Sequence, residues 1–214
     1  YIQGHQEQPS MAGLTDGGYV VTWESPSQDG SGEGVFAQRY GASGEPLGDE
    51  FQVNTWTGNE QNNANVTGLE NGGFFITWQD SSGSANQIGG GESWDVRGQL
   101  YNASGVAQGP EVLINTQTYN DQTAPEVTAL ADGGYVVTWH SRYQDTGSSD
   151  YGIYGQRYDA NGTPSGSEFR ANTYTSGEQT HPAVASLSDG GFVITWQDNT
   201  SQDSDDTSGY GIRG

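Results

Sequence analysis

Apolar side chains recur at alternating positions in one short phrase that occurs four times along the chain. The phrase DGGYVVTW ends at Trp23 and again at Trp139, and near copies end at Trp78 and Trp196. Tyrosine, valine and tryptophan occupy every second position of the phrase, and valine and threonine lie between them. A period of two predicts a β-strand. Apolar residues on both faces indicate that this strand is covered on both sides.

Three further segments recur around each copy of the phrase. The preceding segment ends in a leucine, at Leu14, Leu69, Leu130 and Leu187. The following segment reads GVFAQRY, WDVRGQLY, YGIYGQRY or the shortened YGIRG, and a last segment, present in three copies, reads EFQVNT, EVLINT or EFRANT. One repeat therefore contains four short predicted strands, and its fourth copy is clipped.

A hairpin turn is predicted between the first two segments of each repeat. The linking sequence is Asp-Gly-Gly in three copies and Asn-Gly-Gly in one. Glycine, asparagine and aspartate accept the positive φ angles of tight turns, and the side chains of Asp and Asn also bond to the turn backbone. We therefore expect turn residues rather than metal ligands at Asp16, Asn71, Asp132 and Asp189.

These segments predict an all-β fold of tandem four-stranded antiparallel repeats, similar to a β-propeller with four units of which the last is incomplete. We expect one repeat domain over residues 1–214, with units at about 1–57, 58–118, 119–175 and 176–214. An open stack of sheets or a string of small β-sandwiches is the alternative. In either case the repeated tryptophans are expected to pack between units.

The amino-acid composition of the chain argues against some classes of binding partner. The chain has 27 Asp and Glu against 6 Lys and Arg, a net charge of −21, and 0 Cys. Such a surface repels nucleic acid and anionic membranes, and no apolar run is long enough to insert into a membrane. Without disulfides, the fold depends on its core, on metal or on neighbours. Arginines on the third segments are expected to pair with local carboxylates, at Arg39, Arg97, Arg157 and Arg213.

The combination of DGGYVVTW, QDGSG, YGIYGQRYDANG and EFQVNT resembles a tandem repeat of very large secreted bacterial surface proteins of the RTX-adhesin type, known from cyanobacteria and marine proteobacteria. The resemblance covers essentially the whole chain. It implies an extracellular or cell-surface location, export by a type I pathway and calcium-dependent folding. The glycine-rich nonapeptide repeat that often binds calcium in such proteins does not occur here.

Calcium is nevertheless predicted in the loops that follow the repeated tryptophans. These loops are rich in Asp, Ser and Gly, and three of them contain a Gln-Asp pair followed by a further acid. Calcium takes about 6 to 8 oxygen ligands, which flexible acidic loops can supply. The candidate ligands are Asp29, Glu33, Asp145, Asp150, Asp203 and Asp205. A solvated acidic loop without metal is the alternative.

Aromatic residues outside the repeated phrase are candidates for contact with a ligand or a neighbour. They are Trp56, Trp94, Tyr119, Tyr143 and Tyr174. We expect a non-catalytic structural and adhesive module, stabilised by calcium, in an extracellular filament, matrix or surface layer. Its expected partners are neighbouring repeats, copies of itself and extracellular polysaccharide.

Two other classes of function remain as alternatives. One is a lectin-like β-propeller with one carbohydrate site per repeat, and the other is a hydrolase. Catalysis needs one asymmetric pocket, whereas near-identical repeats build a repeated surface. We therefore expect no enzyme.

Overall fold

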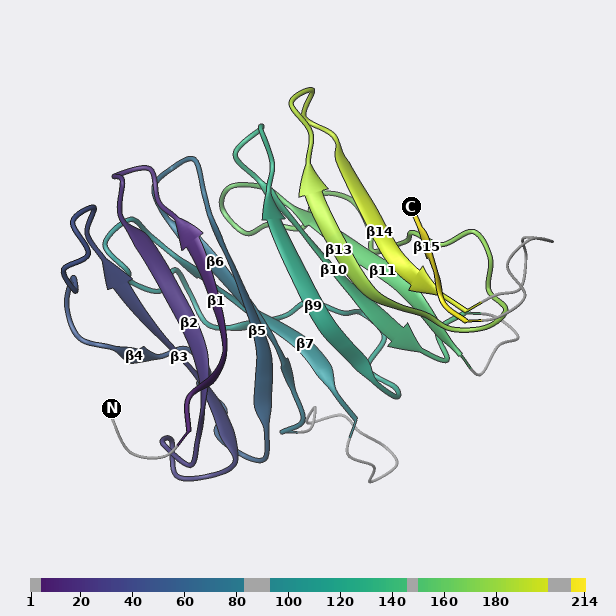
Figure 1. Cartoon of the computed structure of the whole chain (residues 1–214), viewed down its shortest axis with the longest axis horizontal. Coiled ribbons are helices and arrows are strands. Elements are labelled where there is room, and N and C mark those ends of the chain that lie inside the picture. Colours follow the sequence, from purple (N-terminus) through teal and green to yellow (C-terminus); the bar gives the residue numbers. More distant parts are fainter. Residues whose placement is uncertain (1–4, 83–92, 146–149, 200–208) are drawn as a thin grey trace.

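The computed structural model describes residues 5–82, 93–145, 150–199 and 209–214. Across these residues the chain forms strands and no helix. Figure 1 shows the strands grouped into sheets that stand side by side, with the colours following the chain from one sheet to the next. We name the four sheets blades 1 to 4 in chain order. The predicted all-β, propeller-like fold is confirmed.

The blades have the following strands. Blade 1 contains β1 (Glu7–Gly13), β2 (Tyr19–Pro26), β3 (Glu33–Tyr40) and β4 (Phe51–Gln52). Blade 2 contains β5 (Gln61–Gly68), β6 (Phe74–Asp80), β7 (Asp95–Tyr101) and β8 (Val112–Leu113). Blade 3 contains β9 (Gln122–Ala129), β10 (Tyr135–Arg142), β11 (Tyr151–Tyr158) and β12 (Phe169–Arg170). Blade 4 contains β13 (Gln179–Ser186), β14 (Phe192–Asp198) and β15 (Gly211–Arg213).

Within each blade the strands pair antiparallel in chain order. The first strands of successive blades, β1, β5, β9 and β13, contact one another, whereas β4, β8 and β12 form the far edge of their sheets. The first strands thus form the inner side of the array. No helix in the described residues is long and apolar enough to cross a membrane.

The hairpin between the first two strands of each blade has the predicted turn. Asp16 Oδ1 accepts a hydrogen bond from the Gly18 N–H at 2.9 Å, and the φ angle of Gly17 is 84°. The same bond forms at Asn71, Asp132 and Asp189. Since a side chain at a positive φ is strained, glycine at this position is a requirement of the turn. The prediction of turn residues at these four positions is confirmed.

The repeated tryptophans pack between blades. Trp78 joins Val35, Val53 and other residues of blade 1 in one core cluster, and Trp139 joins Phe75 and other residues of blade 2 in the next. Both side chains are 0 % exposed. Trp196 lies in a third cluster, between blades 3 and 4. Trp23 belongs to none of the three clusters and is partly exposed.

A buried asparagine and glutamine connect each blade to the next. Asn54 follows β4, and its Oδ1 accepts the Val35 N–H at 2.9 Å while its Nδ2 donates to Gln61 Oε1 at 2.9 Å. Gln61 is the first residue of β5 and is fully buried. We call this pairing the Asn–Gln bracket. It recurs as Asn115 with Gln122 and as Asn172 with Gln179. Unpaired buried amides are costly, so each bracket fixes how consecutive blades meet.

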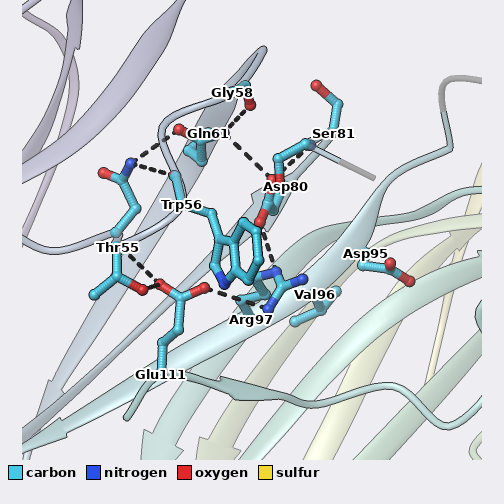
Figure 2. A network of polar contacts seen from close by, with 12 residues as sticks. Thr55, Trp56, Gly58, Gln61, Asp80, Ser81, Asp95, Val96, Arg97 and Glu111 are labelled. Carbon is cyan, nitrogen blue, oxygen red and sulfur yellow. Dashed lines mark hydrogen bonds and ion pairs between the residues drawn. The ribbon is translucent and has the colours of Figure 1, made fainter. Parts of the chain in front are cut away.

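Ion pairs extend the bracket outward (Figure 2). Gln61 Nε2 donates to Asp80 Oδ1 at 3.3 Å, and Asp80 pairs with Arg97 at 2.5 Å. Arg97 also pairs with Glu111 at 3.3 Å, and Glu111 accepts the Thr55 N–H at 2.7 Å. Thr55 belongs to the segment between blades 1 and 2, so this network ties that segment to the outer strands of blade 2.

Candidate functional site

The first strands of all four blades line one pocket of about 720 Å³. We call it the axial pocket. It is lined by Gln8, Pro9, Ser10, Asn63, Ala64, Asn65, Gln79, Thr123, Ala124, Pro125, Glu126, His140, Tyr151, Thr180, His181 and Pro182. Concave sites with converging polar groups are the usual places for small ligands.

A backbone irregularity shapes this pocket in every blade. One non-glycine residue of each first strand has a positive φ: Gln8 at 47°, Asn63 at 52°, Ala124 at 51° and His181 at 51°. The pairing register shifts at the same place in each strand. A β-bulge redirects side chains and is frequent beside functional sites. The bulges therefore place four different residues in the wall of one pocket.

Each of three bulges is held by the residue that follows the tryptophan of the preceding blade. The Asn63 N–H donates to Glu24 Oε1 at 2.5 Å, and the Ala124 N–H donates to Gln79 Oε1 at 3.0 Å. The His181 N–H donates to His140 Nδ1 at 3.3 Å. We call these three contacts the bulge latches.

The third latch defines the state of His140. Its Nδ1 accepts the hydrogen bond from the His181 N–H, so the neutral ring carries its hydrogen on Nε2, which lies 2.5 Å from Thr123 Oγ1. Burial, and then the neighbouring His181, lower the pKa of His140 to about 4. His140 is therefore neutral near pH 7 and serves as an acceptor in the pocket wall.

The repeats differ at two positions beside the bulges. The tryptophan is the same in all four copies, but the residue after it is Glu24, Gln79, His140 or Gln197. The residue two positions after the bulge is Ser10, Asn65, Glu126 or Ala183. Four similar blades consequently build one asymmetric pocket. Comparison of the four copies, position by position, is the sequence signal that could have located these residues.

Two carboxyl groups near the pocket have raised pKa values. Glu126 lines it, half-buried, and accepts a hydrogen bond from Asn65 Nδ2 at 3.0 Å. Burial raises the pKa of Glu126, and the Asn65 hydrogen bond opposes part of that rise. Glu24 is 2 % exposed. Burial raises its pKa to about 7 against the opposing Asn63 N–H bond.

The predicted calcium ligands are engaged by protein groups. Asp29 Oδ1 accepts the Ser31 N–H at 3.0 Å, Glu33 Oε2 accepts from Asn62 Nδ2 at 2.7 Å, and Asp150 Oδ2 accepts the Gly177 N–H at 3.0 Å. Asp145 is buried, where Tyr154, Arg170 and Asn172 donate to it. Asp203 and Asp205 lie outside the described residues. No group of three potential metal ligands gathers within the described part of the chain, and calcium stays a prediction.

None of the predicted aromatic contact residues lines the axial pocket. Trp94 is half-buried, and the others are exposed: Trp56, Tyr119, Tyr143 and Tyr174. Tyr143 lies under the guanidinium of Arg142, 4.9 Å from its ring centre. Tyr174 lines a second cavity of about 480 Å³ with Phe192 and Trp196. A ligand role for these residues stays a prediction.

No family model and no curated protein sequence matches this chain. Solved structures match its fold. An endo-arabinase from Bacteroides thetaiotaomicron VPI-5482 matches with a TM-score of 0.54 at 15 % identity, over 91 % of this chain and 70 % of its own. A Hadza microbial sialidase, Hz136, matches with a TM-score of 0.66 at 11 % identity, over 91 % of this chain and 42 % of its own.

A third similar structure contains a bound sugar. An N-acetylgalactosamine deacetylase from F. plautii, in complex with blood group B trisaccharide, matches with a TM-score of 0.54 at 13 % identity. The match covers 90 % of this chain and 62 % of the deacetylase. This chain thus spans 42 to 70 % of the three proteins. At these identities the likeness shows the fold.

These findings correct two expectations. The prediction of a non-catalytic structural and adhesive module is wrong, because the three similar structures named above are carbohydrate-processing enzymes. The expectation of no enzyme is wrong for the same reason. The repeats are not equivalent, because pocket-lining residues such as Ser10, Asn65 and Glu126 differ between them. What the comparisons and the geometry establish together is a propeller-like, all-β chain whose blades share one asymmetric axial pocket.

Proposed function

We propose that this chain is a carbohydrate-processing hydrolase domain and that its saccharide substrate binds in the axial pocket. The observation that carries the proposal is the asymmetry of that pocket: four repeated blades contribute four different sets of side chains to one space. One of those side chains, Glu126, is a carboxyl group with a raised pKa. The similar folds of an endo-arabinase, a sialidase and a deacetylase support the same class of substrate.

The polar groups of the pocket suit a sugar. Its wall offers neutral amides and hydroxyls, among them Asn63, Asn65, Gln79 and Thr123. Sugar hydroxyls both donate and accept hydrogen bonds, as do the amide side chains facing them. The rings of Pro9, Pro125 and Pro182 add small apolar surfaces between these groups. Neutral donors and acceptors that alternate with small apolar surfaces can hold a saccharide in one orientation in the pocket.

We assign Glu126 the role of proton donor. Hydrolysis of a glycosidic bond requires a proton on the leaving oxygen, and a carboxylic acid with a raised pKa supplies it. Burial holds Glu126 in its protonated form to a higher pH than an exposed glutamate. Asn65, bonded to Glu126 Oε2, fixes the direction of the carboxyl group. Glu24 acts through the backbone of Asn63 and is a positioning residue.

The test is a screen of neutral and acidic polysaccharides and aryl glycosides with the wild-type chain, followed by the Glu126→Gln variant on each substrate that is cleaved. We expect kcat to fall about 10²- to 10⁴-fold in this variant, the usual contribution of a general acid. The matched control is Glu45→Gln, because Glu45 is an exposed glutamate in the turn after β3. A chain that cleaves none of the substrates, or an unchanged kcat in Glu126→Gln, contradicts the proposal.

The proposed activity is compatible with the predicted location. Many polysaccharides are extracellular, and we retain an extracellular or cell-surface location as part of the proposal. Immunoblotting of cell and medium fractions for the natural protein tests this location, and we expect the protein in the medium or on the cell surface.

A further inference from the structure

Every arginine of the chain pairs with a carboxylate. The chain has no Lys, and its six Arg all lie within the described residues. The pairs are Arg39–Asp16 at 3.3 Å, Arg97–Asp80 at 2.5 Å, Arg142–Asp121 at 3.5 Å, Arg157–Asp132 at 2.5 Å, Arg170–Asp145 at 3.3 Å and Arg213–Asp198 at 2.9 Å. The positive side-chain charge that is permanent at neutral pH is thus already neutralised within the protein.

None of these arginines lines the axial pocket. The pocket contains two histidines, of which His140 is neutral because burial lowers its pKa to about 4. A sugar carboxylate, sulfate or phosphate is normally bound by arginine or lysine, which supply charge and several donors together. That partner is missing from the described wall of this pocket.

Backbone amides are the other common anion ligands, and at three of the four bulges the amide is occupied. The N–H groups of Asn63, Ala124 and His181 donate to the latch residues Glu24, Gln79 and His140. A row of free amides can bind an anion in a loop or bulge. Here the strained backbone turns these donors toward protein acceptors.

We infer that the axial pocket accepts an uncharged saccharide and rejects uronic, sialylated, sulfated and phosphorylated sugars. The inference rests on the proposed function and adds the substrate class. Removing an anion from water without a compensating charge is unfavourable, and the net charge of −21 adds long-range repulsion. An uncharged sugar incurs neither cost and can bond to the neutral amides and hydroxyls of the wall.

The test is a glycan array that presents each neutral oligosaccharide beside its uronic, sialylated and sulfated counterpart, probed with the wild-type chain at pH 7.5 and physiological salt. We expect binding to neutral members only, with at least a tenfold lower affinity for each acidic counterpart. Equal or tighter binding of an acidic counterpart overturns this inference and leaves the proposed function standing. Binding and cleavage of neither class overturns both.

A positive charge placed in the axial pocket tests whether the missing cation causes the selectivity for uncharged sugars. Gln8 is exposed and lines the pocket, so Gln8→Arg adds a cation without replacing a latch residue. We expect this variant to raise the affinity for acidic glycans about tenfold. Gln52→Arg, at an exposed position on the outer strand β4, adds the same charge away from the pocket and should not change it. An equal gain in affinity for acidic glycans in both variants, or no gain in either, overturns the assignment of the selectivity to the pocket.

Discussion

The latch between Glu24 and Asn63 makes the stability of the fold dependent on pH. Burial raises the pKa of Glu24 from 4.5 to about 7 in the folded protein. Below pH 4.5 the carboxyl group is protonated in both the folded and the unfolded chain. As pH rises, the unfolded chain loses this proton first, and the folded protein must then lose it at a higher pKa. Glu24 therefore contributes stability that is present at acid pH and is lost as pH rises through about 7.

The size of the effect follows from the shift. A change of one pKa unit corresponds to about 1.36 kcal/mol, so a rise of about 2.5 units, from 4.5 to about 7, lowers the free energy of unfolding by about 3 kcal/mol between acid and alkaline pH. The substitution Glu24→Gln removes the ionisation and retains an oxygen that accepts the Asn63 N–H. Gln79 does this at the equivalent position, where its Oε1 accepts the Ala124 N–H at 3.0 Å.

The assay is urea unfolding followed by tryptophan fluorescence at pH 5 and pH 8.5. We expect Glu24→Gln to be more stable than wild type by about 1 kcal/mol or less at pH 5, just above the unfolded pKa of 4.5, and by about 3 kcal/mol at pH 8.5. The reciprocal variant Gln79→Glu should acquire a penalty of the same sign at pH 8.5. If Glu24→Gln and wild type lose stability in parallel between the two pH values, then Glu24 is not the titrating group and the reasoning is refuted.

Three further predictions concern packing, the bracket and metal. Trp139→Ala should lower the free energy of unfolding by about 3–5 kcal/mol because Trp139 is fully buried between blades. Trp23→Ala should lower it by less than half as much because Trp23 is partly exposed. Equal losses for the two variants in urea unfolding would contradict interblade packing. Asn115→Ala removes the donor to Gln122 Oε1 and the acceptor of the Val96 N–H, and should cost about 1–3 kcal/mol, whereas the exposed Asn161→Ala should cost far less. If calcium binds the acidic loops, EDTA should lower the thermal midpoint, since a ligand of the native state stabilises it; an unchanged melt would remove the calcium prediction.

The repeating units could be recognised from the sequence because their signals are local. The alternation of apolar residues up to Trp78 predicted a strand covered on both faces, and β6 is buried along its whole length. Gly72 after Asn71 predicted a turn with a positive φ, which is 84°. Strand periodicity and turn chemistry act over a few residues, so they are visible without knowing which blades become neighbours.

The site depended on contacts that join different repeats. Glu24 and Asn63 are 39 positions apart, and Asn65 and Glu126 are 61 apart. The residues that the copies share, such as Trp78 and Trp139, form the core between blades. The pocket wall includes positions where the copies differ, among them Ser10, Asn65 and Glu126, and these make it asymmetric. The expectation of no enzyme overlooked them.

The sequence by itself determined the strands, the hairpin turns and the four-fold repetition of this protein, because each results from neighbouring residues along the chain. The tertiary structure decided which unlike residues face one another at the axis, which carboxyl groups are buried there, and which acid neutralises each arginine. The physical reason is that stacking the blades places residues from separate repeats within hydrogen-bonding distance, and burial and charge pairing arise from that placement.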